Sequence, residues 1–141
     1  MDLQEIRDRI EIADVLTRYT RAIDTGDWDK LDTVFTPDAS IDYSESGGII
    51  ASYPEIKPWL AEMLPMFFSK RMHMLGQIEV DLHGDEADVV AYFHNPMLMD
   101  DGQGGQKVVE IGGLYHHTMI RTPDGWRSRQ LHEECVWRRN I

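Results

Sequence analysis

The chain has 141 residues, enough for one domain with a single sizeable hydrophobic core. Hydrophobic residues make up 42% of it and charged residues 28%, which is ordinary for a soluble globular protein. The formal net charge of -11 argues against non-specific binding to a nucleic-acid backbone, because that binding requires clustered Lys and Arg. We therefore expect one domain over residues 1–141 with no nucleic-acid partner.

Cysteine usage and hydropathy indicate the compartment. The single cysteine, Cys135, excludes an internal disulfide framework and fits a reducing environment. No apolar run approaches the roughly 18 residues that a membrane helix needs. The first residues, MDLQEIR, carry charges throughout and do not resemble a secretory signal. These features predict a cytoplasmic protein with no membrane partner.

The first part of the chain has the spacing of helices. Apolar residues recur at helical intervals over 3–23, and Gly26 suits the turn that ends this helix. A second helix is expected from Trp28 to the Thr36-Pro37 step, because proline disfavours helix in the residue before it.

A strand and a third helix are expected next. Residues 39–43 alternate between apolar and polar side chains, and a flexible stretch follows over 44–48. Residues 53–68 predict a third helix, in which Pro65 is expected to cause a break or a kink.

The second half of the chain has the texture of strands. Thr122 to Gly125 carries a strong turn signal, and Gly-rich or polar stretches separate the other segments. Three helices followed by a meander of long strands predict an α+β domain, with helices covering one face of a curved antiparallel sheet. The expected strands cover residues 73–82, 86–99, 107–121 and 126–138.

Asp24 and His73 form a candidate catalytic pair within these segments. Asp24 closes the first helix, where the helix dipole disfavours a negative charge, so its carboxylate needs a donor or cationic partner. A carboxylate that orients an imidazole produces a general base that works near neutral pH. If His73 points inward, strand alternation should turn Gln77 to the same side. The residues alone also allow a structural role, in which the Asp24 side chain caps backbone amides of the turn that follows the helix.

Other polar residues have several interpretations. Tyr19 and Tyr43 can assist a leaving hydroxyl or an enolate oxygen, although buried tyrosines are more often core residues. No ligand spacing matches a known metal motif, so we expect no metal and no cofactor. Glu133 and Glu134 are expected to be solvated. The candidates considered for a metal site are His73, His94, His132 and Asp24.

The segments AIDTGDWDKLDTVFTPDASIDY (22–43) and HMLGQIEV (73–80) resemble the SnoaL-like group of the nuclear-transport-factor-2-like superfamily. The segment GGLYH at 112–116 and the closing pattern of Asp-Gly-Trp126-Arg and Trp137 agree with it. The resemblance covers essentially the whole chain. It implies a curved antiparallel sheet that forms a cone, in which three N-terminal helices enclose a pocket.

Among proteins of this fold, the chain is most similar in its functional residues to cofactor-independent lyases. Scytalone dehydratase, lindane dehydrochlorinase and bile-acid 7α-dehydratase use an Asp–His pair that matches Asp24 and His73. The bile-acid enzyme carries tyrosines that match Tyr19 and Tyr43, but its carboxylate on a later strand matches Asn95. Asparagine can orient a substrate but cannot exchange a proton. The expected substrate-binding residues are Asn95, Gln77, Tyr115 and Trp59.

The resemblance leaves three functions open. The first is a dehydratase-type lyase that acts on a hydrophobic, ring-containing small molecule. The second is an isomerase or cyclase that uses the same base to move a proton, and the third is a small-molecule-binding module without catalysis. A homo-oligomer, either dimer or trimer, is also expected. The apolar residues available for the two sheet faces include Val108, Leu114, Trp126 and Trp137.

Overall fold

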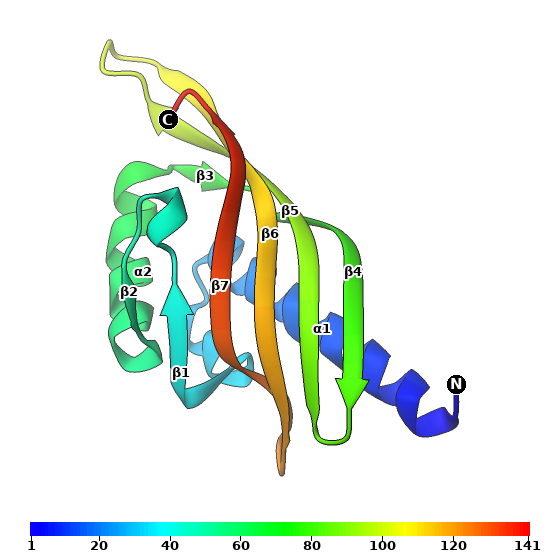
Figure 1. Cartoon of the computed structure of the whole chain (residues 1–141). Helices are drawn as coiled ribbons and strands as arrows, with labels where there is room; N and C mark the ends of the chain where they lie inside the picture. The colour runs from blue at the N-terminus through cyan, green and yellow to red at the C-terminus, as the bar shows by residue number, and fades with distance from the viewer.

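A curved sheet with helices on one side forms the fold of the computed structural model, which describes residues 1–141 (Figure 1). Helix α1 crosses behind the long strands, and α2 lies beside the end of the sheet that β1 and β2 form. No helix combines the length and apolar character that crossing a membrane requires. The elements in chain order are α1 (Leu3–Thr25), η1 (Trp28–Thr33), β1 (Phe35–Asp42), η2 (Ser44–Ser46), β2 (Ile50–Ser52), α2 (Tyr53–Phe67), β3 (Lys70–Arg71), β4 (Met74–His83), β5 (Glu86–Asp100), β6 (Gln106–Thr122) and β7 (Gly125–Arg139).

Helix α1 has well-defined ends. The Asp2 side chain accepts a hydrogen bond from the Glu5 backbone N–H at 2.8 Å, which satisfies one of the free amides of the first turn. Gly26 ends the helix with φ 71°, a left-handed conformation that glycine adopts without steric cost. Asp24, just before this end, therefore has a fixed position. Buried residues along the helix face the sheet and include Ile12, Val15, Leu16, Tyr19 and Ile23.

The sheet contains seven strands in the order β2-β1-β7-β6-β5-β3, and β4 also pairs with β5. Strands β4 to β7 form the expected antiparallel meander, which confirms the predicted α+β class. Strand β1 pairs in parallel with β7, so the sheet is mixed rather than purely antiparallel. A long stretch of chain separates these two strands, and no tight turn forces them to run in opposite directions.

Two local expectations from the prolines, a second helix that reaches Thr36-Pro37 and a break at Pro65, were wrong. The second helix is a short 3-10 helix that ends at Thr33, and β1 already begins at Phe35 and passes through Pro37. Its pairing with β7 is irregular between Phe35 and Ser40, so Pro37 lies where the ladder needs no backbone N–H. Helix α2 continues through Pro65 to Phe67, because only its last turn follows the proline.

Two adjacent glycines let β7 lie close to β6. A Cβ on Gly112 would meet the Trp137 ring at 2.2 Å, and one on Gly113 would meet the Glu134 carbonyl oxygen at 1.8 Å. The pairing of the two strands shifts register at this step. A side chain at either glycine would therefore push β7 away from its position beside β6.

Candidate active site

The concave side of the sheet and the helices enclose a pocket of about 480 Å³, which is within the usual range for small-molecule sites. Of its 21 lining residues, 14 are hydrophobic. Residues 46–49, which follow β1, form one wall, and α2 supplies a second wall through Trp59, Leu60, Met63 and Leu64. The pocket therefore suits a largely apolar ligand that meets a few polar groups. Those polar residues include Tyr19, Tyr43, His73, Asn95 and Glu133.

Asp24 and His73 lie in direct contact, as the sequence predicted. Asp24 Oδ1 is 2.7 Å from His73 Nδ1, and Asp24 Oδ2 accepts the His73 backbone N–H at 2.8 Å. Only 12% of the Asp24 side chain and 9% of the His73 side chain are exposed. Two donors from one residue thus compensate the carboxylate for its unfavourable place at the end of α1.

Arg71 holds the two segments that carry this pair. Its Nε donates to the Ile23 carbonyl at 3.0 Å and its Nη1 to the Phe68 carbonyl at 3.1 Å. Its guanidinium also lies 5.8 Å from the centre of the Trp28 ring. The pKa of Arg71 lies below its ordinary value, because burial lowers it more than the nearby Asp24 charge raises it. Arg71 was not among the residues expected at the site, and its one signal in the sequence is its position two residues before His73.

The contact with Asp24 fixes the tautomer of His73. An ionised carboxylate only accepts hydrogen bonds, so Nδ1 carries the ring proton. Nε2 then has a free lone pair, and no hydrogen bond joins it to the protein. Because His73 lines the pocket, this nitrogen can take a proton from a bound molecule.

Tyrosine hydroxyls form the polar floor of the pocket. Tyr19 Oη and Tyr43 Oη are 2.5 Å apart, and both residues line the pocket. Burial raises the pKa of Tyr19, Tyr43 and Tyr115, so the three hydroxyls stay protonated. Tyr115 lies behind the lining, with its ring stacked on Phe93 at 4.3 Å, and is not itself a pocket residue. These hydroxyls can donate hydrogen bonds but are poor proton donors.

Asn95 lines the pocket and has an unpaired hydrogen-bond acceptor. Its Nδ2 donates to Tyr115 Oη at 2.9 Å, and this bond fixes which way the amide points. Its Oδ1 is buried and has no hydrogen-bond partner. An unpaired buried acceptor costs free energy. Asn95 and Trp59, two of the expected substrate-binding residues, both line the pocket.

The expectation that Gln77 faces the pocket is wrong. The pairing of β4 with β5 shifts register between Leu75 and Ile78, so the alternation that begins at His73 is interrupted. Gln77 is exposed and Ile78 takes the inward position. A one-residue irregularity is sufficient to move a side chain to the other face of a strand.

Glu133 is a buried pocket residue, which contradicts the expectation that it is solvated. It is only 7% exposed, and its Oε1 accepts a hydrogen bond from Ser46 Oγ. Burial, together with the charges of Glu45 and Asp42, raises the pKa of Glu133 to about 7, although Ser46 and His132 lower it. The sequence offered one signal: Leu131 lies two residues earlier on β7, and strand alternation turns both residues to the same face.

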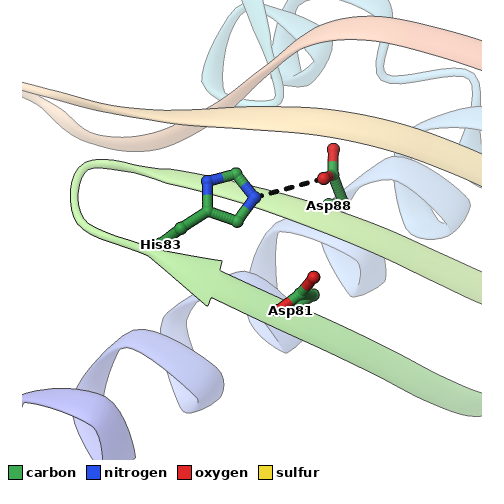
Figure 2. Close-up of side chains that lie close together, drawn as sticks. All are labelled: Asp81, His83 and Asp88. Carbon is green, nitrogen blue, oxygen red and sulfur yellow. Dashed lines mark hydrogen bonds and ion pairs between the residues drawn. The ribbon is translucent and has the colours of Figure 1, made fainter.

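The histidines do not gather around a common ion. His94 Nε2 is 2.9 Å from Glu110 Oε1, and His132 contacts Asp42 and Glu45, so both lie in environments separate from that of His73. A different group has suitable geometry: Asp81, His83 and Asp88, whose candidate ligand atoms lie within 4.8 Å of one another (Figure 2).

The group in Figure 2 has a simpler explanation. Asp81 and Asp88 are cross-strand partners in the β4–β5 hairpin, and His83 lies diagonally from Asp88, with Nε2 3.1 Å from Asp88 Oδ2. All three residues are exposed and none lines the pocket. A surface hydrogen bond therefore accounts for the contact.

Known proteins resemble this chain at the level of family and fold. It is 43% identical over 136 residues to an uncharacterized protein of Mycobacterium tuberculosis, with 96% of this chain and 90% of the relative covered. It is 26% identical over 129 residues to a probable cyclase of Gibberella zeae, with 85% of each chain covered.

Solved structures agree on the fold. A hexachlorocyclohexane dehydrochlorinase, LinA type 2, matches with a TM-score of 0.86 and 16% identity over 100% of this chain and 93% of that one. A nuclear-transport-factor-2-like superfamily protein from Salmonella enterica matches with a TM-score of 0.76 and 18% identity, covering 99% and 97%. At these identities the likeness concerns the fold alone. The SnoaL-like domain model matches residues 4–132, and the chain therefore belongs to the SnoaL-like family.

Proposed function

We propose that the protein is a cofactor-independent lyase of the dehydratase type. The observation that carries this proposal is the His73–Asp24 pair, joined by a 2.7 Å contact at the wall of a mostly apolar pocket of about 480 Å³. A base in such a pocket selects a hydrophobic molecule, and the pocket volume suits a compound with one or more rings.

In the proposed reaction, His73 Nε2 removes a proton from a carbon that a neighbouring carbonyl makes acidic. Asp24 stabilises the imidazolium that forms and keeps the ring in its orientation. Negative charge then develops on the substrate oxygen, and Tyr43 or Tyr19 donates a hydrogen bond to it. The oxyanion can then expel a group from the next carbon, which completes the elimination.

A second candidate function is isomerisation or cyclisation by the same base. The relative described as a probable cyclase, which is 26% identical, supports this alternative. In that reaction the proton taken by His73 is returned to another atom and no group leaves. The two candidates differ in product mass, because only a dehydration loses water.

A panel of hydroxylated ring compounds, with products identified by mass spectrometry, tests the proposal. The wild type should convert at least one compound, and His73→Ala should lower its turnover by about 10²–10⁴-fold while ligand affinity changes little. His83→Ala is the matched control, because His83 is exposed and lies outside the pocket. Tight binding without turnover, unchanged by His73→Ala, would instead identify a binding module.

We also propose that the protein forms a homo-oligomer through the outer face of the sheet. Tyr92, Val108 and Trp137 are 57%, 47% and 43% exposed, and the helices cover only the opposite face. Light scattering at micromolar concentration should give a mass above that of one chain. A monomer under these conditions would rule out this assembly.

A further inference from the structure

Glu133 is a buried titratable group in the pocket that the proposed base does not use. It lies on β7, whereas His73 precedes β4, and strands β5 and β6 lie between them in the sheet. The two residues therefore lie at different places along the pocket wall. Both residues line the same pocket.

Only one oxygen of the Glu133 carboxyl has a partner. Ser46 Oγ contacts Oε1 and lies 3.2 Å from the Tyr43 carbonyl oxygen. Because Ser46 Oγ donates to Oε1, the proton of the neutral carboxyl lies on Oε2. No hydrogen bond joins Oε2 to the protein. That oxygen is free to contact a ligand.

The surroundings of Glu133 favour its protonated form. The largest cause is its burial, and the carboxylates of Asp42 on β1 and Glu45 on η2 add repulsion. The neighbouring side chains from other elements carry uncharged hydroxyls. They are Tyr19 on α1, Tyr43 after β1 and Tyr115 on β6. His132 on β7 acts in the opposite direction, and the resulting pKa of about 7 leaves a proton available near neutral pH.

We propose that Glu133 donates the proton to the departing hydroxyl oxygen in the elimination, an inference that rests on the proposed lyase function. Hydroxide is a poor leaving group, and it departs readily only as water. The tyrosine hydroxyls of the pocket have pKa values raised far above neutrality, so Glu133 is the better acid there. The substrate is therefore a ring compound with a hydroxyl group β to its carbonyl.

The proposed step balances in protons and electrons. His73 Nε2 takes the proton from the carbon beside the carbonyl, and the electrons of that C–H bond form the new carbon–carbon double bond. The bond from the adjacent carbon to the hydroxyl oxygen breaks, and its electron pair stays on the oxygen. Glu133 gives its proton to that oxygen and water leaves. Imidazolium and carboxylate then return to their starting states by proton exchange with solvent.

Two probe reactions separate the acid from the base. Dehydration of 4-hydroxy-4-phenylbutan-2-one needs a proton on the leaving oxygen, and its conjugated product absorbs in the ultraviolet. Ring opening of 5-nitrobenzisoxazole needs only removal of a carbon-bound proton, because its phenolate leaves unprotonated. Glu133→Gln keeps the shape of the side chain and removes its acidity. Glu134→Gln, one residue along and outside the pocket, is the matched control.

Glu133→Gln should lower the dehydration rate by about 10²–10⁴-fold and slow ring opening far less. Glu133→Asp should restore part of the dehydration rate, because an acid is present again. In the wild type, kcat/KM for dehydration should fall as pH rises above about 7, since Glu133 loses its proton there, and Glu133→Gln should lack this fall.

The possible failures have distinct meanings. If His73→Ala slows ring opening but Glu133→Gln leaves dehydration unchanged, the base proposal stands and the role of Glu133 is overturned. A wild type that opens 5-nitrobenzisoxazole but never dehydrates the hydroxyketone would overturn that role too. If ring opening does not depend on His73, the proposed function itself fails.

Discussion

Replacing Glu133 by Gln should change how the stability of the fold depends on pH. Burial raises the pKa of Glu133 from its ordinary value of 4.5 to about 7, so the folded protein holds this proton more tightly than the unfolded chain does. The stabilisation is fully present below pH 4.5 and is lost as pH rises towards about 7. Glutamine has no proton to lose, so Glu133→Gln should remove this part of the pH dependence.

The size of the effect follows from the two pKa values. A rise in pKa from 4.5 to about 7 means that Glu133 lowers the free energy of unfolding by about 3 kcal/mol between a pH below both pKa values and a pH above both. Part of this difference already exists at pH 5, so the free energy of unfolding of the wild type should fall by roughly 2–3 kcal/mol more than that of Glu133→Gln between pH 5 and pH 8.5.

Urea denaturation followed by circular dichroism at pH 5, 7 and 8.5 measures this difference. Glu134→Gln serves as the control, because the Glu134 side chain is 41% exposed and pairs with His116 at 2.8 Å. It should follow the pH profile of the wild type closely. Parallel profiles for the wild type and Glu133→Gln would mean that Glu133 is solvated and would refute the reasoning.

Three further predictions concern residues around the base and the core. Arg71→Ala should lower kcat more than it changes KM in steady-state kinetics, because Arg71 positions the Asp24 and His73 segments without lining the pocket. Nitrogen-15 NMR of neutral His73 should show a proton on Nδ1 and none on Nε2; the reverse tautomer would contradict the geometry. Asp8→Asn should lower the free energy of unfolding at pH 7 by about 3–5 kcal/mol in urea titrations, because it leaves Arg121 without its buried partner. That loss should shrink below pH 4, since Arg121 holds the pKa of Asp8 below its ordinary value and the wild type loses the ion pair only in acid.

Much of the fold could be predicted from local patterns in the chain. The helical spacing before Gly26 and the Thr122–Gly125 turn signal correspond to features of α1 and of the β6–β7 hairpin in the structure. The parallel pairing of β1 with β7 could not be predicted, because it joins segments almost a hundred residues apart. The path of β1 through Pro37 depends on the same distant partner.

At the site, too, some features could be predicted from the sequence and others could not. The Asp24–His73 contact could be predicted because the resemblance places both residues and because a carboxylate at a helix end needs a donor. The orientation of Gln77 could not, since the register shift between Leu75 and Ile78 has no marker in the sequence. Burial of Glu133 depends on residues 44–48 closing over β7 through Ser46, a long-range contact that strand alternation alone does not fix.

The most direct test of the account is the rate at which the protein opens 5-nitrobenzisoxazole, compared among the wild type, His73→Ala and Asp24→Asn. We expect a rate about 10²–10⁴-fold lower for His73→Ala, because the base is gone. Asp24→Asn should show a comparable loss, because an amide keeps the shape of the carboxylate but cannot stabilise the imidazolium. Rates that are the same in all three folded proteins would contradict the assignment of His73 as the base.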